Sequence, residues 1–309
     1  MRDNNALAFM LPRKHFIAHG KVLIESLRKM GGIYKKIHIF IMVPSSEKNF
    51  IEDIKEQIRD DFYEIVLFPL EGSRILFPFK DKVYAAAYAE EYSIKRNISQ
   101  LLWMDIDSFF IRNLNEIFLE NDKQFGYRPV DKKNIGLEWG SRIHTFWKYI
   151  YNSFDITERD LFFVETAVDN LPIYPYFNAG FMIIRPYIGL FELWKKKFDE
   201  LYLKDVFLKL YDEDFRYAIF VHQAILSGAI IKSFSREELT CLDEKISFPI
   251  HLLDEMNEEK SKKILSAISC RYDTFFNQSH YDLLGLKDEI AILLAENFEK
   301  LRMAWYYEG

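Results

Sequence analysis

The sequence is poor in cysteine and has no long apolar run, and each shortage excludes a class of protein. Two cysteines among 309 residues are too few for a disulfide framework. No stretch approaches the roughly 20 apolar residues of a membrane-spanning helix. The apolar run at residues 6–10 is too short for the hydrophobic region of a signal peptide. We therefore expect a cytoplasmic protein with no integral membrane segment, for which peripheral membrane contact stays open.

Basic residues are also scarce relative to acidic ones. Lys and Arg number 41 against 47 Asp and Glu, and the resulting net charge of −6 argues against broad nucleic-acid binding. Hydrophobic residues make up 49% and charged residues 28%, which is typical of a globular protein long enough to bury a core. Aromatic residues reach 17%, and we expect most of these rings to fill the core.

Strand and helix patterns alternate through the first half, which favours a parallel sheet. We expect strands at residues 6–11, 37–43, 64–68 and 101–104. Helices should lie between them, one from about residue 16 to 30, one capped by Ser45 or Ser46, and one from about residue 82 to 95. This arrangement is typical of a doubly wound α/β sheet, whose natural ligand is a nucleotide lying across the strand ends.

The second half is less regular. It should contain a strand at residues 176–184 and then a helix with Phe191, Trp194 and Phe198 on one face. The C-terminal helix should carry one apolar stripe, made of Ile290, Leu294, Phe298, Leu301 and Trp305. No repeat or linker divides the chain, so we predict one domain over residues 1–309, with its nucleotide-binding half at about 1–120.

One segment carries the strongest chemical signal. Leu101-Leu102-Trp103-Met104 reads as the end of a buried strand, and Asp105-Ile106-Asp107 places two carboxylates directly after it. Carboxylates at such a strand end suit Mg²⁺ or Mn²⁺ together with substrate phosphates. A plainer alternative is that the two aspartates cap the next segment. The same spacing recurs in Asp212-Glu213-Asp214 without an apolar strand before it, and there we expect a solvated turn or helix start.

Five motifs occur in an order and spacing that resemble the retaining glycosyltransferases of family eight, glycogenin-like in particular. The motifs are Lys82-Val83-Tyr84, Trp103-Met104-Asp105-Ile106-Asp107, Phe177-Asn178-Ala179-Gly180-Phe181, His222-Gln223, and His280-Tyr281 followed by Gly285 and Lys287. The resemblance implies the GT-A fold, in which helices flank a Rossmann-like, mostly parallel mixed sheet, with an acceptor or lid half at about residues 121–309. It also implies a nucleotide-sugar donor, UDP-sugar by default, with Mn²⁺ or Mg²⁺ and transfer to a carbohydrate or other hydroxyl acceptor with retention.

The resemblance also implies residue roles. Metal ligands would be Asp105, Asp107 and His280. Donor contacts would come from Lys82, Asp105, Ile106, Gly180 and Lys287, and the residues acting at the reacting sugar would be Asn178, His222, Gln223 and Lys82. In such a front-side displacement the leaving phosphate oxygen takes the acceptor proton, so no dedicated protein base is needed.

Two departures from the family pattern bear on these roles. His222 stands where the family has an acidic residue near the reacting sugar, and imidazole can donate or accept a hydrogen bond or become cationic. Asp288-Glu289 replaces the Pro-Trp that follows the last lysine in the family. These departures concern the donor sugar and the lid more than the reaction class.

Alternatives stay open for several of these residues. Lys82 could be an ordinary exposed lysine, and residues 178–180 could form a tight bend that needs small side chains. His251 competes with His280 as the third metal ligand. Two other functions also remain: a non-catalytic nucleotide-sugar binder, and a phosphatase whose Asp105 is a nucleophile, although Phe109 stands where that class has Thr or Val. The aromatic-rich stretch at residues 139–163 is a candidate for the acceptor side.

Overall fold

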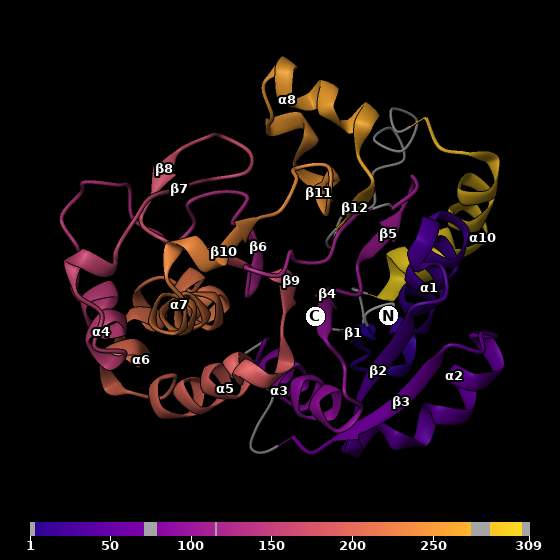
Figure 1. Ribbon diagram of the computed structural model, residues 1–309, viewed down its shortest axis with the longest axis horizontal. Helices are drawn as coiled ribbons and strands as arrows, with labels where there is room; N and C mark the ends of the chain where they lie inside the picture. Colours follow the sequence, from indigo (N-terminus) through magenta and orange to yellow (C-terminus); the bar gives the residue numbers. More distant parts are fainter. Residues whose placement is uncertain (1–3, 71–78, 115, 273–284, 305–309) are drawn as a thin grey trace. The chain divides into compact units, whose positions relative to one another are not determined.

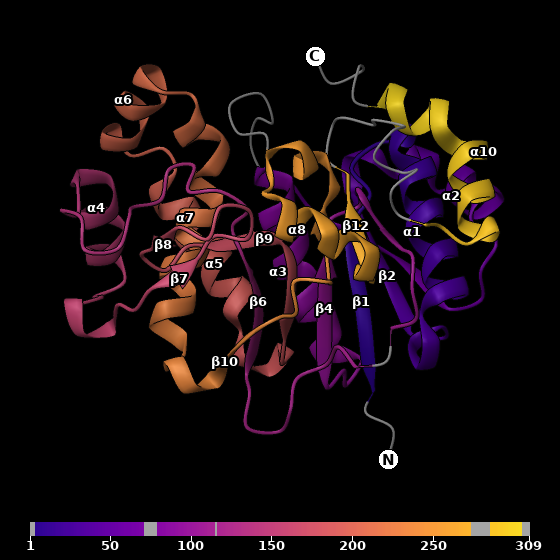
Figure 2. The same ribbon diagram turned by 90° about the horizontal axis from the view of Figure 1, so that it is seen from above.

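The computed structural model describes residues 4–70, 79–114, 116–272 and 285–304. Contacts divide the chain into two compact units, each assembled from three stretches of sequence. Unit 1 comprises residues 1–6, 68–103 and 118–241, and unit 2 comprises residues 7–67, 104–117 and 242–309. Figures 1 and 2 show the helices and strands of both units. The single domain over residues 1–309 stays a prediction.

Unit 2 begins with alternating strands and helices, coloured indigo to violet in Figure 1. In order these are β1 (Asn5–Met10), α1 (Ile17–Met30), β2 (His38–Pro44), α2 (Ile51–Gln57) and β3 (Tyr63–Phe68). Their strands lie in the sheet in the order β1-β2-β3. The central residues of β1 and all but the first residue of β2 are buried. Such continuous apolar strands form where helices cover both faces of a parallel sheet.

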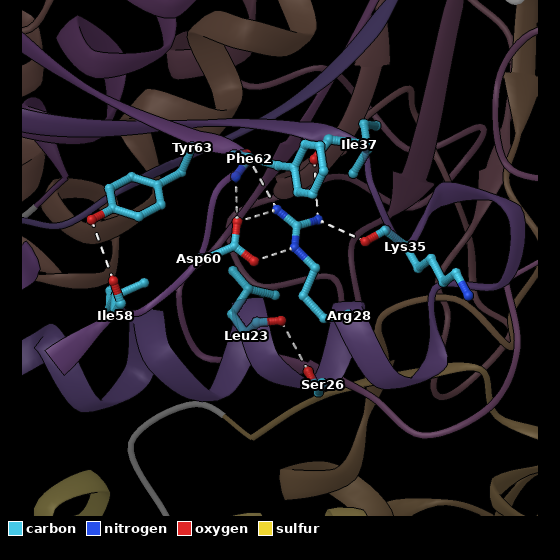
Figure 3. Close-up of polar contacts among 9 residues, drawn as sticks. All are labelled: Leu23, Ser26, Arg28, Lys35, Ile37, Ile58, Asp60, Phe62 and Tyr63. Carbon is cyan, nitrogen blue, oxygen red and sulfur yellow. Dashed lines mark hydrogen bonds and ion pairs between the residues drawn. The ribbon is translucent and has the colours of Figure 1, made fainter.

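One arginine ties the loops of unit 2 to α1 (Figure 3). Arg28 donates from Nε to Asp60 Oδ2 at 2.6 Å and from Nη2 to Asp60 Oδ1 at 2.9 Å. Its remaining hydrogen bonds go to the backbone carbonyls of Lys35, Ile37 and Phe62. Because a guanidinium presents its donors in a fixed fork, this one side chain fixes the loops that lead into β2 and β3.

The later part of unit 2 adds a small sheet and two helices. The sheet has the order β11-β12-β5, in which β12 (Ser269–Arg271) runs antiparallel to β5 (Ser108–Phe110) and parallel to β11 (Phe248–Pro249). Helix α8 is Glu258–Lys262, and α10 (Asp288–Ala304) packs against α1, as Figures 1 and 2 both show.

Most of the predicted C-terminal stripe is buried. The buried apolar residues of α10 are Ile290, Leu293, Leu294 and Leu301. Phe298 is half-buried, and Trp305 lies outside the described residues.

Unit 1 contains a mixed sheet and five helices among its described residues. Its strands lie in the order β10-β6-β9-β4, where β6 (Phe125–Pro129) is parallel to β10 and antiparallel to β9. The other strands are β4 (Gln100–Met104), β9 (Phe177–Ile184), β10 (Leu239–Cys241) and the hairpin of β7 (Val164–Glu165) with β8 (Pro172–Ile173). The helices are α3 (Lys80–Lys95), α4 (Thr145–Ser153), α5 (Leu190–Leu201), α6 (Asp205–Glu213) and α7 (Arg216–Ser233).

Helix α7 forms the centre of helix packing in unit 1, with α4, α5 and α6 against it. Gly228 permits the approach of α4, because a Cβ at this position would lie 2.5 Å from the ring of Phe154, directly after α4. Helix α5 also packs against α3, and the predicted face of Phe191, Trp194 and Phe198 is fully buried there.

The predicted α/β fold with a mostly parallel mixed sheet flanked by helices is confirmed, and two local predictions are wrong. No serine caps the second helix: α2 begins at Ile51 with Phe50 at its N-cap, after a 3-10 turn over Ser45–Phe50. The second Asp-X-Asp copy ends α6, where we expected a turn or helix start. Among the described residues, no helix is both long and apolar enough to cross a bilayer.

Candidate active site

The carboxylates predicted to bind metal follow β4 directly in the chain and belong to unit 2. Asp107 is 6% exposed, Asp105 is half-buried, and the side chain of Ile106 between them is buried. A carboxylate with so little access to water needs compensating positive charge or hydrogen bonds. Burial alone does not assign a metal, but it sets Asp107 apart from the exposed Asp212 in the second copy of the motif.

The C-terminal part of unit 2 reaches the same place. β12 pairs with β5 so that Arg271 lies opposite Ser108, and Tyr272 donates its backbone N–H to the carbonyl of Asp107 at 3.0 Å. His280 lies outside the described residues. The competing His251 contacts the carbonyl of Arg271 through Nδ1 at 3.3 Å.

The side chains at this strand end are suited in kind to Mn²⁺ or Mg²⁺, because both ions prefer oxygen ligands and carboxylates supply them. Within residues 4–70, 79–114, 116–272 and 285–304, no three His, Cys, Asp or Glu side chains are grouped to hold a metal. Asp105 and Asp107 would supply two ligands of a bound ion, and a third would have to come from elsewhere. His251 forms no such group with the two aspartates, and a role for His280, which lies outside the described residues, stays a prediction.

In unit 1, the Phe-Asn-Ala-Gly motif forms an irregularity in β9. Tyr127 of β6 pairs with Met182 and Pro129 pairs with Phe177, so the single residue Arg128 faces residues 178–181. Bulges of this kind re-aim side chains and are common beside active sites. Asn178 Oδ1 accepts the N–H of Gly180 at 2.6 Å, and Asn178 Nδ2 has no hydrogen-bond partner among the described residues. The tight-bend alternative and a ligand-binding role are thus both compatible with this motif.

Gln223, on α7, joins two motifs that are far apart in the sequence. Its Oε1 accepts the N–H of Ala179 at 3.0 Å, and its Nε2 donates to the hydroxyl of Tyr176 at 3.3 Å. One turn later on α7, Ser227 accepts the N–H of Phe177 at 3.1 Å and donates to the carbonyl of Gln223 at 2.8 Å. These bonds hold the start of β9 on α7 and fix the orientation of the Gln223 amide, which keeps one Nε2 hydrogen for a ligand.

His222, which stands where the family has an acidic residue, is a buried neutral imidazole. Burial and, second, the charge of Lys82 lower the pKa of His222 well below its usual value of 6.5. Its ring stacks on Phe79 with 4.7 Å between centroids and on Trp194 with 6.3 Å. Nδ1 bonds the carbonyl of Ile219 at 2.8 Å, which assigns the hydrogen to Nδ1 and leaves Nε2 as an acceptor. The cationic form considered from the sequence is therefore excluded near neutral pH.

Lys82 is not an ordinary exposed lysine, since only 9% of it is exposed. It lies in the first turn of α3, with Nζ 4.9 Å from the centre of the Phe79 ring. The same aromatic ring thus contacts both Lys82 and His222. A lysine ammonium placed at a helix N-terminus is suited to binding an anion.

The remaining predicted residues have less distinctive surroundings. Gly180 is buried within β9. Lys287 is exposed and precedes α10, where its carbonyl accepts the N–H groups of Ile290 and Ala291. Unit 1 therefore brings together Lys82, Asn178, Gly180, His222 and Gln223, while unit 2 holds Asp105, Asp107 and Lys287.

Sequence reasoning missed three residues of this group. Tyr176 and Phe79 position Gln223 and His222, and Arg128 is a 5% exposed cation opposite the bulge in β9. Arg128 had a usable signal, since a charged residue inside an otherwise apolar strand is rarely buried without a role. Tyr176 and Phe79 had none, because their partners lie more than 40 residues away.

Solved structures similar to this chain include glycosyltransferases at low sequence identity. GlyE of Streptococcus pneumoniae TIGR4 is 12% identical with a TM-score of 0.47, covering 97% of this chain and 64% of GlyE. Mouse xyloside xylosyltransferase 1 is 12% identical with a TM-score of 0.46, covering 87% and 98% of the two chains. The bifunctional glycosyltransferase WbbM is 10% identical with a TM-score of 0.49, covering 96% of this chain and 52% of WbbM. No curated protein sequence matches.

A family model provides the identification. The model of the Rhodobacterales glycosyltransferase domain matches residues 7–213, more than half of the chain. The matched range includes Lys82, the Asp105-Ile106-Asp107 motif and the bulge of β9. The protein therefore belongs to the Rhodobacterales glycosyltransferase domain family and is a glycosyltransferase.

Proposed function

We propose that this glycosyltransferase moves a sugar from a UDP-sugar to an acceptor hydroxyl, with the help of Mn²⁺ or Mg²⁺ and with retention at the anomeric carbon. The observation that carries the proposal is the hydrogen bond from Ala179 N–H to Gln223 Oε1. This bond joins the Phe-Asn-Ala-Gly motif to the His-Gln motif. Each of these motifs resembles, on its own, a motif of the retaining enzymes of family eight.

The reacting sugar would meet three polar groups of unit 1. Asn178 Nδ2 and the second hydrogen of Gln223 Nε2 are donors to sugar hydroxyls or to the ring oxygen. His222 Nε2 is an acceptor for a hydroxyl, and this replaces the carboxylate of the family without adding negative charge. Because each residue is anchored through its other polar atom, their orientation is fixed before the donor binds, which favours catalysis by positioning.

The diphosphate of the donor would meet positive charge. Lys82 supplies an ammonium in the first turn of α3, and Lys287 would supply a second. A divalent ion held by Asp105 and Asp107 would neutralise the negative charge that collects on the leaving group.

In the reaction itself, the acceptor oxygen forms a bond to the anomeric carbon on the face from which UDP departs. The bond between that carbon and the phosphate oxygen breaks, and UDP leaves with the electron pair. The acceptor proton passes to the departing phosphate oxygen, so no protein base is required and the atoms balance.

The proposal is tested by incubating the full chain with a panel of UDP-sugars, with and without Mn²⁺, and by following UDP release. We expect slow hydrolysis of at least one donor in Mn²⁺, with the α-anomer of the freed sugar appearing first in proton NMR spectra. Initial release of the opposite anomer would refute retention. Failure of every UDP-sugar, with turnover of a donor carrying another base, would refute the uridine assignment.

A further inference from the structure

Unit 1 has an open cavity of about 250 Å³ that lies outside the candidate active site. Its lining consists of Trp139, Ile143, Glu158, Leu161 and Tyr174. Four of these five residues fall in the aromatic-rich stretch at residues 139–163, which the sequence singled out for the acceptor side. The contacts of these residues specify the chemistry of a ligand.

Two aromatic side chains, Trp139 and Tyr174, line the cavity. Trp139 is 42% exposed, and its ring lies 4.8 Å from that of Tyr174, at 53° between planes. The ring of Phe163, which is 43% exposed, lies 6.1 Å from the ring of Trp139. Large rings left in water forgo about 25 cal/mol for each Å² of apolar surface that they could bury. The C–H face of a pyranose ring would cover this surface and leave its hydroxyls at the edge.

Polar groups at the edge match such hydroxyls. The carboxylate of Glu158 and the indole Nε1 of Trp139 have no hydrogen-bond or ion-pair partner among the described residues. Trp139 is held by its N–H to the carbonyl of Pro172 at 2.9 Å. Glu158 starts a 3-10 turn that is fixed by the capping box of Thr157 and Asp160. Both groups therefore sit on anchored backbone, as expected for a largely pre-formed binding site.

The size of the cavity limits what it can hold. Sites for drug-sized ligands measure about 300–1,000 Å³, so an open cavity of about 250 Å³ suits a single ring better than a whole nucleotide sugar. Its position is also bounded, because Tyr174 and Asn178 are four residues apart and their Cα atoms can be at most about 14 Å apart. A short saccharide can span that distance from the candidate sugar-transfer residues.

We propose that this cavity, the Trp139 subsite, binds one uncharged pyranose ring of a saccharide acceptor, a few sugar units from the hydroxyl that is glycosylated. This inference rests on the proposed function, since it presupposes that the acceptor is a saccharide. A quaternary ammonium ligand would also suit aromatic rings beside a carboxylate. The neutral ring is favoured because Glu158 is the only charged residue of the lining and is exposed, so its attraction for a cation is screened by water.

The test uses the full chain without donor and four probes: the methyl pyranosides of glucose, galactose and N-acetylglucosamine, and choline. Binding is measured by saturation-transfer NMR and titration. We expect at least one pyranoside to bind the wild type. Trp139→Ala should weaken that binding by about tenfold or more, and Glu158→Gln by a few-fold because the carboxylate acceptor is lost. The control Phe215→Ala removes a 63% exposed ring elsewhere in unit 1 and should bind as the wild type does.

The outcomes separate this inference from the proposed function. Thermal unfolding shows whether Trp139→Ala is folded, and Glu158→Gln keeps the test valid if it is not. Wild-type protein that hydrolyses a UDP-sugar but binds no pyranoside would overturn the subsite alone. Equal binding by the wild type and the folded variants, or preference for choline, would also overturn it. Pyranoside binding that depends on Trp139, without hydrolysis of any nucleotide sugar, would support a pyranose-binding site but contradict the proposed function, and with it the assignment of the ring to an acceptor.

Discussion

Glu90 offers a sharp test of how unit 1 holds the helix that carries Trp194. Glu90 lies on α3 and is 1% exposed. Its Oε2 accepts the N–H of Glu192 in the first turn of α5 at 2.9 Å, while Oε1 has no partner among the described residues. Burial raises the pKa of Glu90 from 4.5 to about 7, and the backbone amides at the start of α5, that of Glu192 first, oppose this rise only in part.

The sign and size of the effect on stability follow from this pKa. Because the folded value lies above the unfolded one, the folded chain binds the proton more tightly. The associated stability is complete below pH 4.5 and is lost as the pH rises through about 7. The gap between 4.5 and about 7 corresponds to about 3 kcal/mol, at about 1.4 kcal/mol per pKa unit.

Glutamine mimics the protonated carboxyl, since it is uncharged and keeps one oxygen for the Glu192 N–H. The free energy of unfolding of Glu90→Gln should therefore equal that of the wild type near pH 4.5. Above pH 8 it should exceed the wild-type value by up to about 3 kcal/mol.

The assay is urea unfolding between pH 4.5 and 8.5, followed by tryptophan fluorescence. Four of the five tryptophans lie in unit 1, so the signal reports mainly on that unit. The two proteins must be compared at each pH, because buried histidines act in the opposite direction. Burial and then the charge of His15 lower the pKa of His19 to about 3, and the pKa of His222 is also depressed, so both destabilise the fold as the pH falls below 6.5.

The control for this prediction is Glu91→Gln, which changes the neighbouring exposed carboxylate. Glu91 pairs with Lys95 at 2.5 Å on the helix surface, and such pairs contribute less than about 1 kcal/mol. A Glu90→Gln difference that does not vary between pH 4.5 and 8.5, or a variant less stable than the wild type at pH 8.5, would refute the reasoning.

Three further substitutions test other parts of the account. Gln223→Leu leaves the buried N–H of Ala179 and the hydroxyl of Tyr176 without their partner. The free energy of unfolding in urea should therefore fall by about 2–5 kcal/mol. A decrease below about 1 kcal/mol would contradict the observed bonds. His222→Phe keeps the aromatic stack but removes the Nε2 acceptor. UDP-sugar turnover should therefore fall at least about tenfold, while the melting temperature changes by a few degrees only. Unchanged turnover would show that His222 does not act in the site. Arg28→Lys loses the bidentate ion pair and the backbone bonds in Figure 3. The stability of unit 2, measured from hydrogen exchange of the β2 and β3 amides, should therefore fall by about 2–4 kcal/mol. An unchanged exchange rate would contradict this prediction.

Local sequence patterns predicted the elements of the fold well. The strands β1, β2 and β4 and the helices α1 and α3 follow from apolar runs and helical spacing, which need only neighbouring residues. The start of α2 was missed because the Pro-Ser-Ser signal precedes a 3-10 turn that delays the helix to Ile51. That choice depends on packing around Phe50, which is 2% exposed.

The candidate site was predictable only as separate motifs. Sequence placed Asn178 and Gln223 in one function through resemblance, but the bond between Ala179 and Gln223 joins residues 44 positions apart. The neutrality of His222 could not be read either, because it results from burial against Phe79 and Trp194 and from the charge of Lys82. Such properties depend on long-range packing, which periodicity does not encode.

Asp107 is the residue on which the proposed chemistry depends most, and an exposed aspartate of the second Asp-X-Asp copy gives a control. Asp107 is buried after β4, whereas Asp212 is exposed near the end of α6. Calorimetric titration of UDP into the wild type, Asp107→Asn and Asp212→Asn, each with Mn²⁺ and with chelator, measures the coupling between metal and nucleotide directly. We predict that Mn²⁺ tightens UDP binding by about tenfold or more in the wild type and in Asp212→Asn, and has no effect in Asp107→Asn. Equal tightening in all three proteins, or UDP binding that ignores Mn²⁺ in the wild type, would contradict the account.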